Sequence, residues 1–305
     1  ALEDYDRALQ LDPENAAAYN NRGMCKTQLR RNAEALVDFD RALQLDPENA
    51  AAYANRGLCK TRLGRNAEAL EDFDRALQLD PTIVLAYCNR GVSKRDLGRH
   101  AEALEDFDRA LQLGPESADA YVNRGLSKAD LGRDAEAIED YDRALRLVPQ
   151  DAAVYANRGV SNDHLGRNAE ALEDFERSLQ LDPQDVFTYF ARGVLRIKLG
   201  RHAEALEDFD RALQLDPESA DAFNNRGLCK TQLGRNAEAL ADFDRVLQLD
   251  PQDPAAYANR GLCNSRLGRH AEALEDFDRA LQLGLPAPSD EKVRLLRAES
   301  AKRLR

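Results

Sequence analysis

An asparagine directly before an Arg-Gly pair recurs along the chain at intervals of 34 residues or a multiple of 34. An amide side chain offers one hydrogen-bond acceptor and two donors, so it is able to pair with both polar groups of a peptide unit. A row of such amides would hold an extended backbone with little regard to its sequence. The alternative is that the amides are inherited, solvated residues. The row consists of Asn21, Asn55, Asn89, Asn123, Asn157, Asn225 and Asn259.

One copy of this pattern reads FTYFARG and has Ala191 in place of the asparagine. Its apolar residues are Phe187, Phe190, Val194 and Ile197, whose spacing predicts that they share one face of a helix. They predict a local apolar pocket that takes one anchor side chain of a ligand. The alternative is that the two phenylalanines pack against each other or on a neighbouring helix, since aromatic residues most often belong to a core.

The arginine after the asparagine position is present in every copy, from Arg22 to Arg260, next to a glycine that permits close helix contact. An arginine in such a place is expected to be partly buried and to need a carboxylate partner. The natural candidate is an aspartate further along the copy, for example Asp72 for Arg56. The sequence therefore predicts a structural ladder of ion pairs. Phosphate binding, for which arginine is also suited, is the alternative.

Residue types that catalyse reactions are present, but not in recognised patterns. The histidines form no HExxH motif and no other ligand spacing. Acidic pairs such as Glu71 and Asp72 recur along one helix in each copy, which indicates a solvated face rather than an acid–base dyad. Since nothing pairs a nucleophile with a base, the sequence predicts no enzymatic activity, no cofactor and no metal site.

The cysteines are separated too widely for disulfides. Four of them occupy one place in the repeating pattern, and equivalent helices that lie ~10 Å apart exceed the reach of a disulfide. They predict small buried thiols in a reducing compartment, and hence an intracellular, cytoplasmic protein. The cysteines are Cys25, Cys59, Cys88, Cys229 and Cys263.

Composition excludes two classes of partner. The formal net charge is −12, whereas nucleic-acid binding depends on Lys and Arg that neutralise phosphates. Apolar runs stay well short of the ~18 residues that a membrane helix needs. The chain starts without Met and inside a repeat, so we expect it to be part of a longer protein.

The pattern has a period of 34 residues, which the prolines mark from Pro13 to Pro251. A fixed period of this size is typical of a solenoid. With Ala16 as position 1, eight copies span residues 16–49, 50–83, 84–117, 118–151, 152–185, 186–219, 220–253 and 254–287. Residues 1–15 are the second half of an earlier copy, and residues 288–305 form a tail.

Each copy is predicted to form two helices, near 50–63 and 67–79 in the second copy. Asn49 is expected to cap the first helix, and Gly64 to end it in the left-handed conformation. Asn66 is the predicted N-cap of the second helix, and three other copies have histidine at that position. Pro81 stops the second helix.

These residues resemble the tetratricopeptide repeat family, whose 34-residue unit has an aromatic residue at position 4, Gly at 8, Ala at 20, an aromatic residue at 24, Ala at 27 and Pro at 32. The second copy has Tyr53, Gly57, Ala69, Phe73, Ala76 and Pro81 at these positions. The departures are Ser178 and Val246 at position 27, and Leu285 at position 32. The resemblance implies an all-α, right-handed superhelix of antiparallel helix pairs with the first helices along its concave groove.

Variation between the copies is concentrated in the first helix. Positions 2, 5, 12 and 13 vary, whereas positions 18, 19, 20, 23, 26, 28 and 30 of the second helix are the same in all eight copies. In tetratricopeptide arrays, positions 2, 5, 9, 12 and 13 share the groove face. The contrast favours a constant frame with a variable recognition surface, and drift after duplication is the alternative.

The asparagine row is similar to the ladder in the tetratricopeptide portion of O-GlcNAc transferase. The resemblance therefore implies a scaffold that binds an extended peptide or protein segment in the groove. A second hypothesis is the sensor or substrate-presenting arm of a larger protein, resembling O-GlcNAc transferase or an NB-ARC ATPase receptor. A third is a solenoid that stacks end to end.

Both ends of the array carry predictions. Leu2, Tyr5 and Leu9 belong to a second helix without its first helix, so their apolar face is expected to be bare and to allow self-association. Residues 288–305 are predicted to form a capping helix with Val293, Leu296, Ser300 and Leu304 on its less polar face. A basic docking helix is the alternative for this tail.

Overall fold

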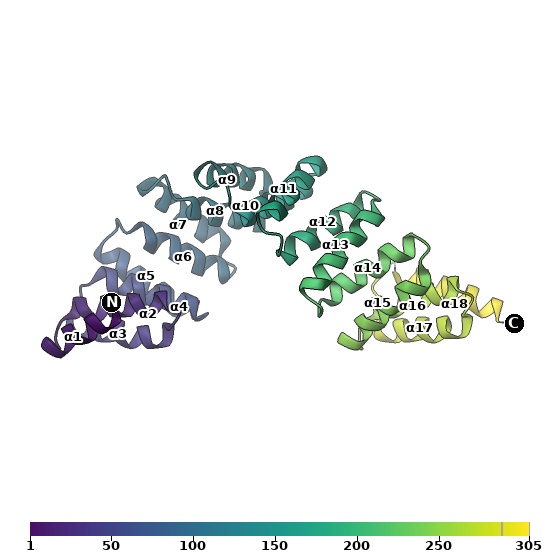
Figure 1. Cartoon of the computed structure of the whole chain (residues 1–305), viewed down its shortest axis with the longest axis horizontal. Helices are drawn as coiled ribbons and strands as arrows, with labels where there is room; N and C mark the ends of the chain where they lie inside the picture. Colours follow the sequence, from purple (N-terminus) through teal and green to yellow (C-terminus); the bar gives the residue numbers. More distant parts are fainter. Residues whose placement is uncertain (288, 305) are drawn as a thin grey trace. The chain divides into compact units, whose positions relative to one another are not determined.

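The computed structural model describes residues 1–287 and 289–304, and over these residues all the regular secondary structure is α-helical (Figure 1). It divides into two units, Ala1–Leu165 and Gly166–Arg305, and in each unit consecutive helices pack side by side in chain order. The first unit contains α1 (Leu2–Leu11), α2 (Ala16–Gln28), α3 (Asn32–Leu45), α4 (Ala50–Arg62), α5 (Asn66–Leu79), α6 (Val84–Asp96), α7 (His100–Leu113), α8 (Ala118–Asp130), α9 (Asp134–Leu147) and α10 (Ala152–His164). The second unit contains α11 (Asn168–Leu181), α12 (Val186–Lys198), α13 (His202–Leu215), α14 (Ala220–Gln232), α15 (Asn236–Leu249), α16 (Pro254–Arg266), α17 (His270–Leu283) and α18 (Ser289–Arg303). The fold class predicted from the sequence, an all-α solenoid of helix pairs, is confirmed.

The first helix of the second copy begins where the sequence predicts and ends one residue before the predicted end. In α4 the Asn49 side chain accepts a hydrogen bond from the Ala52 backbone N–H at 3.0 Å, which satisfies a donor that the helix itself cannot pair. After α4, Gly64 has φ +73°, the left-handed conformation that terminates a helix.

The first copy has an arginine where every other copy has this glycine. Arg30 follows α2 with φ 59°, and it is the one non-glycine residue with positive φ in the described part of the chain. A side chain in this conformation brings Cβ close to the following carbonyl oxygen, at a cost of roughly 1–2 kcal/mol. The sequence analysis did not single out Arg30, although its exchange for glycine was visible there.

The second helices begin one residue earlier than predicted, so the prediction that Asn66 caps α5 is wrong. Asn66 is the first residue of the helix, and Arg65 is the N-cap. The histidines at this position, such as His100 in α7, are likewise inside their helices. Arg65 instead forms a paired hydrogen bond with Glu68 at 2.8 and 2.5 Å, which places a carboxylate near the positive end of the helix dipole.

Within each unit, the core of a copy is an aromatic ring packed on a glycine. Phe73 of α5 is fully buried, and a Cβ atom added to Gly57 of α4 would lie 2.8 Å from its ring. The glycine therefore allows the two helices to approach closely enough for the ring to fill the space between them. Gly125 and Tyr141 repeat this contact at 2.6 Å.

Within each unit, a buried carboxylate holds a first helix on the second helix of the same copy. Arg56 donates from Nε and Nη2 to Asp72 at 3.0 and 2.6 Å, and Lys60 lies 2.8 Å from the same carboxylate. Asp72 is only 3% exposed, so both cations are needed to compensate its desolvation. The predicted ion-pair ladder is confirmed, with the following further pairs: Arg22–Asp38, Arg90–Asp106, Arg124–Asp140, Arg192–Asp208, Arg226–Asp242 and Arg260–Asp276.

The same arginine also joins neighbouring copies, which the sequence analysis did not predict. Arg56 Nη1 donates to Asp40 of the preceding copy at 2.7 Å, and its guanidinium lies 5.5 Å from the centre of the Tyr53 ring. At the start of the array, the hydrogen bond to Asp38 raises the pKa of Arg22 above its usual range. Such an arginine is a three-way joint between a first helix, its own second helix and the preceding second helix, and the same pair of contacts is made by Arg22, Arg90, Arg124, Arg226 and Arg260.

The last helix, α18, packs on the array as a further first helix would. Arg297 pairs with Asp278 of α17, as the ladder arginines pair with the preceding copy, and the Ser300 hydroxyl lies 3.1 Å from that of Ser265. Val293 and Ser300 of the predicted apolar face are buried, but Leu304 is 52% exposed. Pro288 and Arg305, the ends of the predicted capping helix, lie outside the described residues.

The first helix of the chain, α1, is less bare than predicted. Leu9 is buried, and Leu2 and Tyr5 are half-buried, whereas Leu11 is 82% exposed. Asp6 also pairs with Arg22 of α2 at 2.6 Å. The ladder therefore attaches this helix to the array.

The ladder predicts unequal effects when its two partners are removed. Asp140→Leu leaves both Arg124 and Lys128 without their buried carboxylate, so we expect it to lower the free energy of unfolding by about 3–5 kcal/mol. Arg124→Met leaves Asp140 paired with Lys128, so its effect is expected to be smaller. Urea unfolding followed by circular dichroism measures both effects.

The control is Asp108→Asn, which removes the half-exposed outer partner of Arg124 and is expected to change stability by less than about 1 kcal/mol. Combining Arg124→Met with Asp140→Leu is expected to recover part of the loss caused by Asp140→Leu alone. A loss in the double variant that equals the sum of the losses in the two single variants would show that the buried pair is not coupled.

Candidate functional site

Two rows of side chains run along the first helices. The asparagines at position 6 are all half-buried, and so reach the surface. Three residues later on the same helices, position 9 is aliphatic in every copy, and each of these side chains is at least partly accessible. This aliphatic row consists of Met24, Leu58, Val92, Leu126, Val160, Val194, Leu228 and Leu262.

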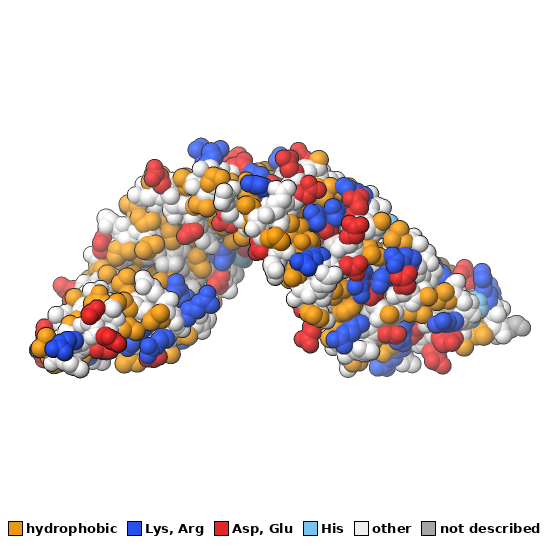
Figure 2. Space-filling view, in the orientation of Figure 1, with side chains coloured by type: hydrophobic (Ala, Val, Ile, Leu, Met, Phe, Trp, Pro, Cys, Tyr) orange, Lys and Arg blue, Asp and Glu red, His pale blue; other side chains and the backbone are white. Residues whose placement is uncertain are grey.

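The aliphatic row was missed by the sequence analysis, apart from Val194. At position 9 the exact residue changes from copy to copy but stays aliphatic, so a comparison of residue identities does not reveal the row. Met24 is 40% exposed and Val194 is 38% exposed, and the other six side chains of the row are half-buried. In Figure 2, apolar side chains reach the surface of residues 1–165 in separate patches between charged ones.

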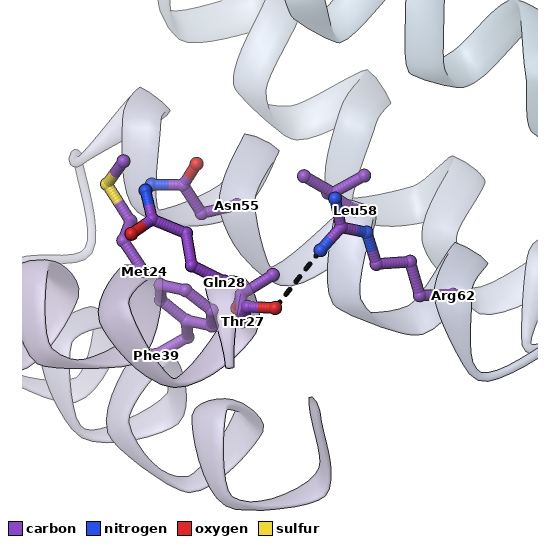
Figure 3. Close-up of a pocket in the computed structure, with 7 residues that line it drawn as sticks. All are labelled: Met24, Thr27, Gln28, Phe39, Asn55, Leu58 and Arg62. Carbon is purple, nitrogen blue, oxygen red and sulfur yellow. Dashed lines mark hydrogen bonds between the residues drawn. The ribbon is translucent and has the colours of Figure 1, made fainter. Parts of the chain in front are cut away.

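Adjacent first helices enclose a small pocket that shows how the rows meet (Figure 3). Its volume is about 190 Å³, and α2 and α4 both contribute to its lining. In the close-up, Met24, Gln28 and Asn55 come together on one side, and Arg62 closes the other side with a hydrogen bond to the Thr27 carbonyl oxygen at 3.2 Å. An amide, an aliphatic side chain and a guanidinium are thus available within one hollow.

Internal hydrogen bonds orient several of the row asparagines. Asn55 donates to Asn20 of the preceding copy at 3.0 Å, and Asn259 donates to Asn224 at 3.2 Å. Asn225 instead donates to the Asp221 carbonyl oxygen one turn earlier on its own helix. Each of these bonds occupies one N–H of an amide that has two N–H groups and an oxygen.

Both the N–H and the oxygen of the Asn123 amide form hydrogen bonds within the protein. It donates to the Asp119 carbonyl oxygen at 2.8 Å and accepts from Arg95 of the preceding copy at 2.7 Å. The amides of the row are therefore not equivalent, although the sequence makes them look so. The difference depends on positions 5 and 12, which vary from copy to copy.

At position 12, Thr27 and Thr61 contact the next copy, and the predicted place of this position on the groove face stays a prediction. The Thr27 hydroxyl lies 2.9 Å from Cys59 Sγ, and the Thr61 hydroxyl lies 2.8 Å from that of Ser93. First helices lie side by side, and residues at the edge of the predicted face are covered by the neighbouring helix. Variation at this position therefore reflects packing between copies.

The four apolar residues of the FTYFARG copy are divided by the structure. Phe187 is 52% exposed and Val194 is also exposed. Phe190 packs edge-on against Phe209 with ring centres 5.8 Å apart, and Ile197 packs against the core that contains Phe209. Phe190 and Ile197 thus have a packing role, and Phe187 and Val194 face outward.

A pocket of about 340 Å³ lies beside Phe187 and Phe190, between α12 and the start of α14. Its lining is mainly apolar, and Asp221 is its charged residue. Phe190 therefore serves both the core and this pocket. The pocket is lined by Val186, Phe187, Phe190, Ala212, Ser219, Asp221 and Ala222.

The thiols have the character of core residues. Cys59, Cys229 and Cys263 are buried, and Cys25 and Cys88 are half-buried. Burial raises the pKa of Cys229 to about 11, which leaves little of the reactive thiolate at neutral pH. Over residues 1–287 and 289–304, no group of three or more His, Cys, Asp or Glu side chains could hold a metal ion.

A solenoid of α-helix pairs with a period of 34 residues is the architecture of one class of repeat protein. Tetratricopeptide repeat models match residues 16–49, 50–83, 88–152, 129–186, 190–254 and 235–299. The chain therefore belongs to the tetratricopeptide repeat family. No protein of curated function matches the sequence. In the described ranges, the helices are too short or too polar to cross a membrane.

Solved structures share this fold. A chain of the APC/C hetero-tetramer Cut9–Hcn1 is 18% identical with a TM-score of 0.62, and the match covers 96% of this chain and 56% of that one. A tetratricopeptide repeat protein from Parabacteroides merdae is 21% identical with a TM-score of 0.58, over 83% and 98% of the two chains. YrrB, a tetratricopeptide repeat protein with an unusual peptide-binding site, is 24% identical with a TM-score of 0.52, over 63% and 99%.

The two phenylalanines are predicted to differ in their effect on stability. Phe190→Ala removes a ring that packs on Phe209, so we expect the free energy of unfolding to fall by about 3 kcal/mol. Phe187→Ala removes a half-exposed ring and is expected to cost less than about 1 kcal/mol. Thermal and urea unfolding compare the two variants, and equal losses would place Phe187 in the core as well.

Proposed function

We propose that this chain is a scaffold that binds an extended peptide or protein segment along its first helices. The observation that carries the proposal is the pairing of two rows, asparagine at position 6 and an aliphatic residue at position 9. Residues three apart on a helix are neighbours on one face, so the rows run beside each other from copy to copy. The amides supply partners for a peptide backbone, and the aliphatic residues supply contacts for its side chains.

The spacing of the copies suits an extended ligand. Packed helices lie ~8–10 Å apart, and an extended chain advances ~3.3 Å per residue. One copy therefore matches roughly three ligand residues. The first unit contains the first helices α2, α4, α6, α8 and α10, which would span roughly a dozen ligand residues.

Family membership supports the same conclusion. Tetratricopeptide repeat proteins are generally scaffolds for protein interactions, and a pure array of such repeats is typical of proteins without catalytic activity. YrrB is a member with a peptide-binding site of its own. The specific similarity of the asparagine row to that of O-GlcNAc transferase stays a prediction from the sequence.

We further propose that the pocket beside Phe187 takes an apolar anchor residue of the ligand. Val186, Phe187 and Phe190 give it an apolar wall, and Ala191 replaces the amide that would otherwise stand there. Burial of one aliphatic or aromatic anchor would contribute roughly 1.5–3 kcal/mol. Asp221 at the rim favours a cation over an anion next to the anchor.

Selection from a library of unstructured 15-residue peptides tests the proposal on the full chain. We expect binders whose affinity falls when Asn55 and Asn89 are both replaced by Ala, and again when Leu58 and Val92 are replaced by Ser. Removing one hydrogen bond between a partly exposed amide and the peptide backbone is expected to weaken binding by about 0.5–1.5 kcal/mol. Isothermal titration calorimetry with the selected peptide measures the change.

The matched control replaces Gln44 and Gln78 by Ala. Both glutamines are exposed on second helices, where they bond to Arg41 and Arg75. Their removal is expected to leave affinity unchanged. Peptide binding that falls equally in the control, or that ignores the asparagine and aliphatic rows, would contradict the proposal.

Two other predictions concern the whole protein. A role as the sensor or substrate-presenting arm of a larger protein, resembling O-GlcNAc transferase or an NB-ARC receptor, stays a prediction from the sequence. Self-association through α1 also stays a prediction, and the burial of Leu9 lessens the apolar surface available for it. Light scattering across a range of concentrations measures the mass on which this prediction depends.

A further inference from the structure

A second, polar pocket adjoins the one shown in Figure 3. It has a volume of about 550 Å³ and is lined by Gln28, Arg30, Asn32 and Arg62. Gln28 and Arg62 line both pockets, so the amide and aliphatic surface around Met24 and Asn55 continues into a surface that carries two guanidinium groups.

Arg30 adopts the left-handed conformation that the fold requires at this position, and a non-glycine residue does so only with strain. Every later copy has glycine at the same position, with φ between 72° and 77° in residues 64 to 268. Arg30 is exposed, and no ion pair or hydrogen bond of its side chain occurs within residues 1–287 and 289–304. Strained residues that make no stabilising contact of their own are found at binding sites, where the side chain serves the ligand.

The positive charge of this pocket is not neutralised by its surroundings. The neighbouring arginines, Arg31 and Arg65, are each paired with a glutamate at 2.5 Å. Arg62 donates to the neutral Thr27 carbonyl oxygen, which fixes the guanidinium beside the pocket without cancelling its charge. Two unpaired guanidinium groups therefore lie together in a chain whose net charge is −12.

We propose that the pocket formed by Gln28, Arg30, Asn32 and Arg62 binds a carboxylate of the peptide ligand. Guanidinium groups bind carboxylates through paired, charge-assisted hydrogen bonds, and the amides of Gln28 and Asn32 add further donors. The carboxylate belongs either to an acidic side chain or to the C-terminus of the ligand. The inference rests on the proposed function, since it identifies the chemistry of one end of the same peptide site.

The chain contains a natural control for this pocket. Arg266 of the eighth copy is at the position of Arg62 and donates to the Thr231 carbonyl oxygen at 3.0 Å, and the seventh copy has Gln232 and Asn236 at the positions of Gln28 and Asn32. At the position of Arg30 it has Gly234. Arg30 is therefore the difference between the two sets of residues.

The first experiment uses a carboxylate alone, N-acetylglutamic acid α-amide, and does not depend on peptide binding. Nitrogen-15 NMR follows the arginine Nε–Hε signals of the full chain, and the spectrum of Arg30→Gly identifies the Arg30 signal. We expect the Arg30 signal to move in a saturable way as the carboxylate is added, and to move less at high salt because the contact is exposed. The neutral analogue N-acetylglutamine amide is the control, and an Arg30 signal that ignores the carboxylate would overturn the proposal.

The second experiment compares three fluorescent peptides of leucine and serine by anisotropy. One is neutral and amidated, one is amidated with a single glutamate, and one has a free C-terminus and no glutamate. We expect a carboxylate peptide to bind about fivefold more tightly than the neutral one. The peptide that gains identifies whether the carboxylate comes from a side chain or from the chain end.

Arg30→Gly is expected to abolish this preference while it raises the melting temperature, because the strain is removed. Gly234→Arg is expected to create a second carboxylate site and to lower the melting temperature. A preference that survives Arg30→Gly would overturn the carboxylate site. Equal binding of all three peptides would also overturn the carboxylate site, but it would leave the proposed peptide-binding function intact. A response of the Arg30 signal to the carboxylate without binding of any peptide would contradict the proposed peptide-binding function.

Discussion

The buried aspartate at position 23 is the constraint on which the rest of the array depends. A carboxylate such as Asp72 is almost fully removed from water, and it is stable there only because Arg56 and Lys60 both reach it. The cations come from the first helix and the carboxylate from the second, so the pair fixes the rotation of one helix on the other. A hydrophobic contact alone would allow the helices to slide, whereas paired hydrogen bonds specify one arrangement.

The ladder also determines what the first helices display. With Arg56 turned towards Asp72 and Asp40, the asparagine before it and the aliphatic residue two positions after it remain partly accessible. Repetition of the same joint aligns these residues into rows within each unit. The candidate site is therefore a consequence of the ladder, and its local variants, the Phe187 pocket and the Arg30 pocket, arise where single copies depart from the common sequence.

The fold, the ion pairs within each copy and the caps of the first helices could be predicted because they depend on contacts inside one repeat. Contacts between copies could not be assigned in this way. The bond from Arg56 to Asp40 and the contact of Thr27 with Cys59 depend on how neighbouring helices are placed, and a single copy does not reveal that placement. The division of Phe187 from Phe190 has the same origin, since an adjacent ring covers one and not the other.

Hydrogen–deuterium exchange of Asp140→Asn tests most directly whether the buried carboxylate holds the first helix in place. The substitution keeps the size of the side chain and removes its charge, which leaves Arg124 and Lys128 without their partner. The account predicts faster exchange throughout α8 and in the adjoining α9, with α2 to α5 unchanged. Unchanged exchange in α8 would show that apolar packing alone positions the first helices, and would contradict the central role of the ladder.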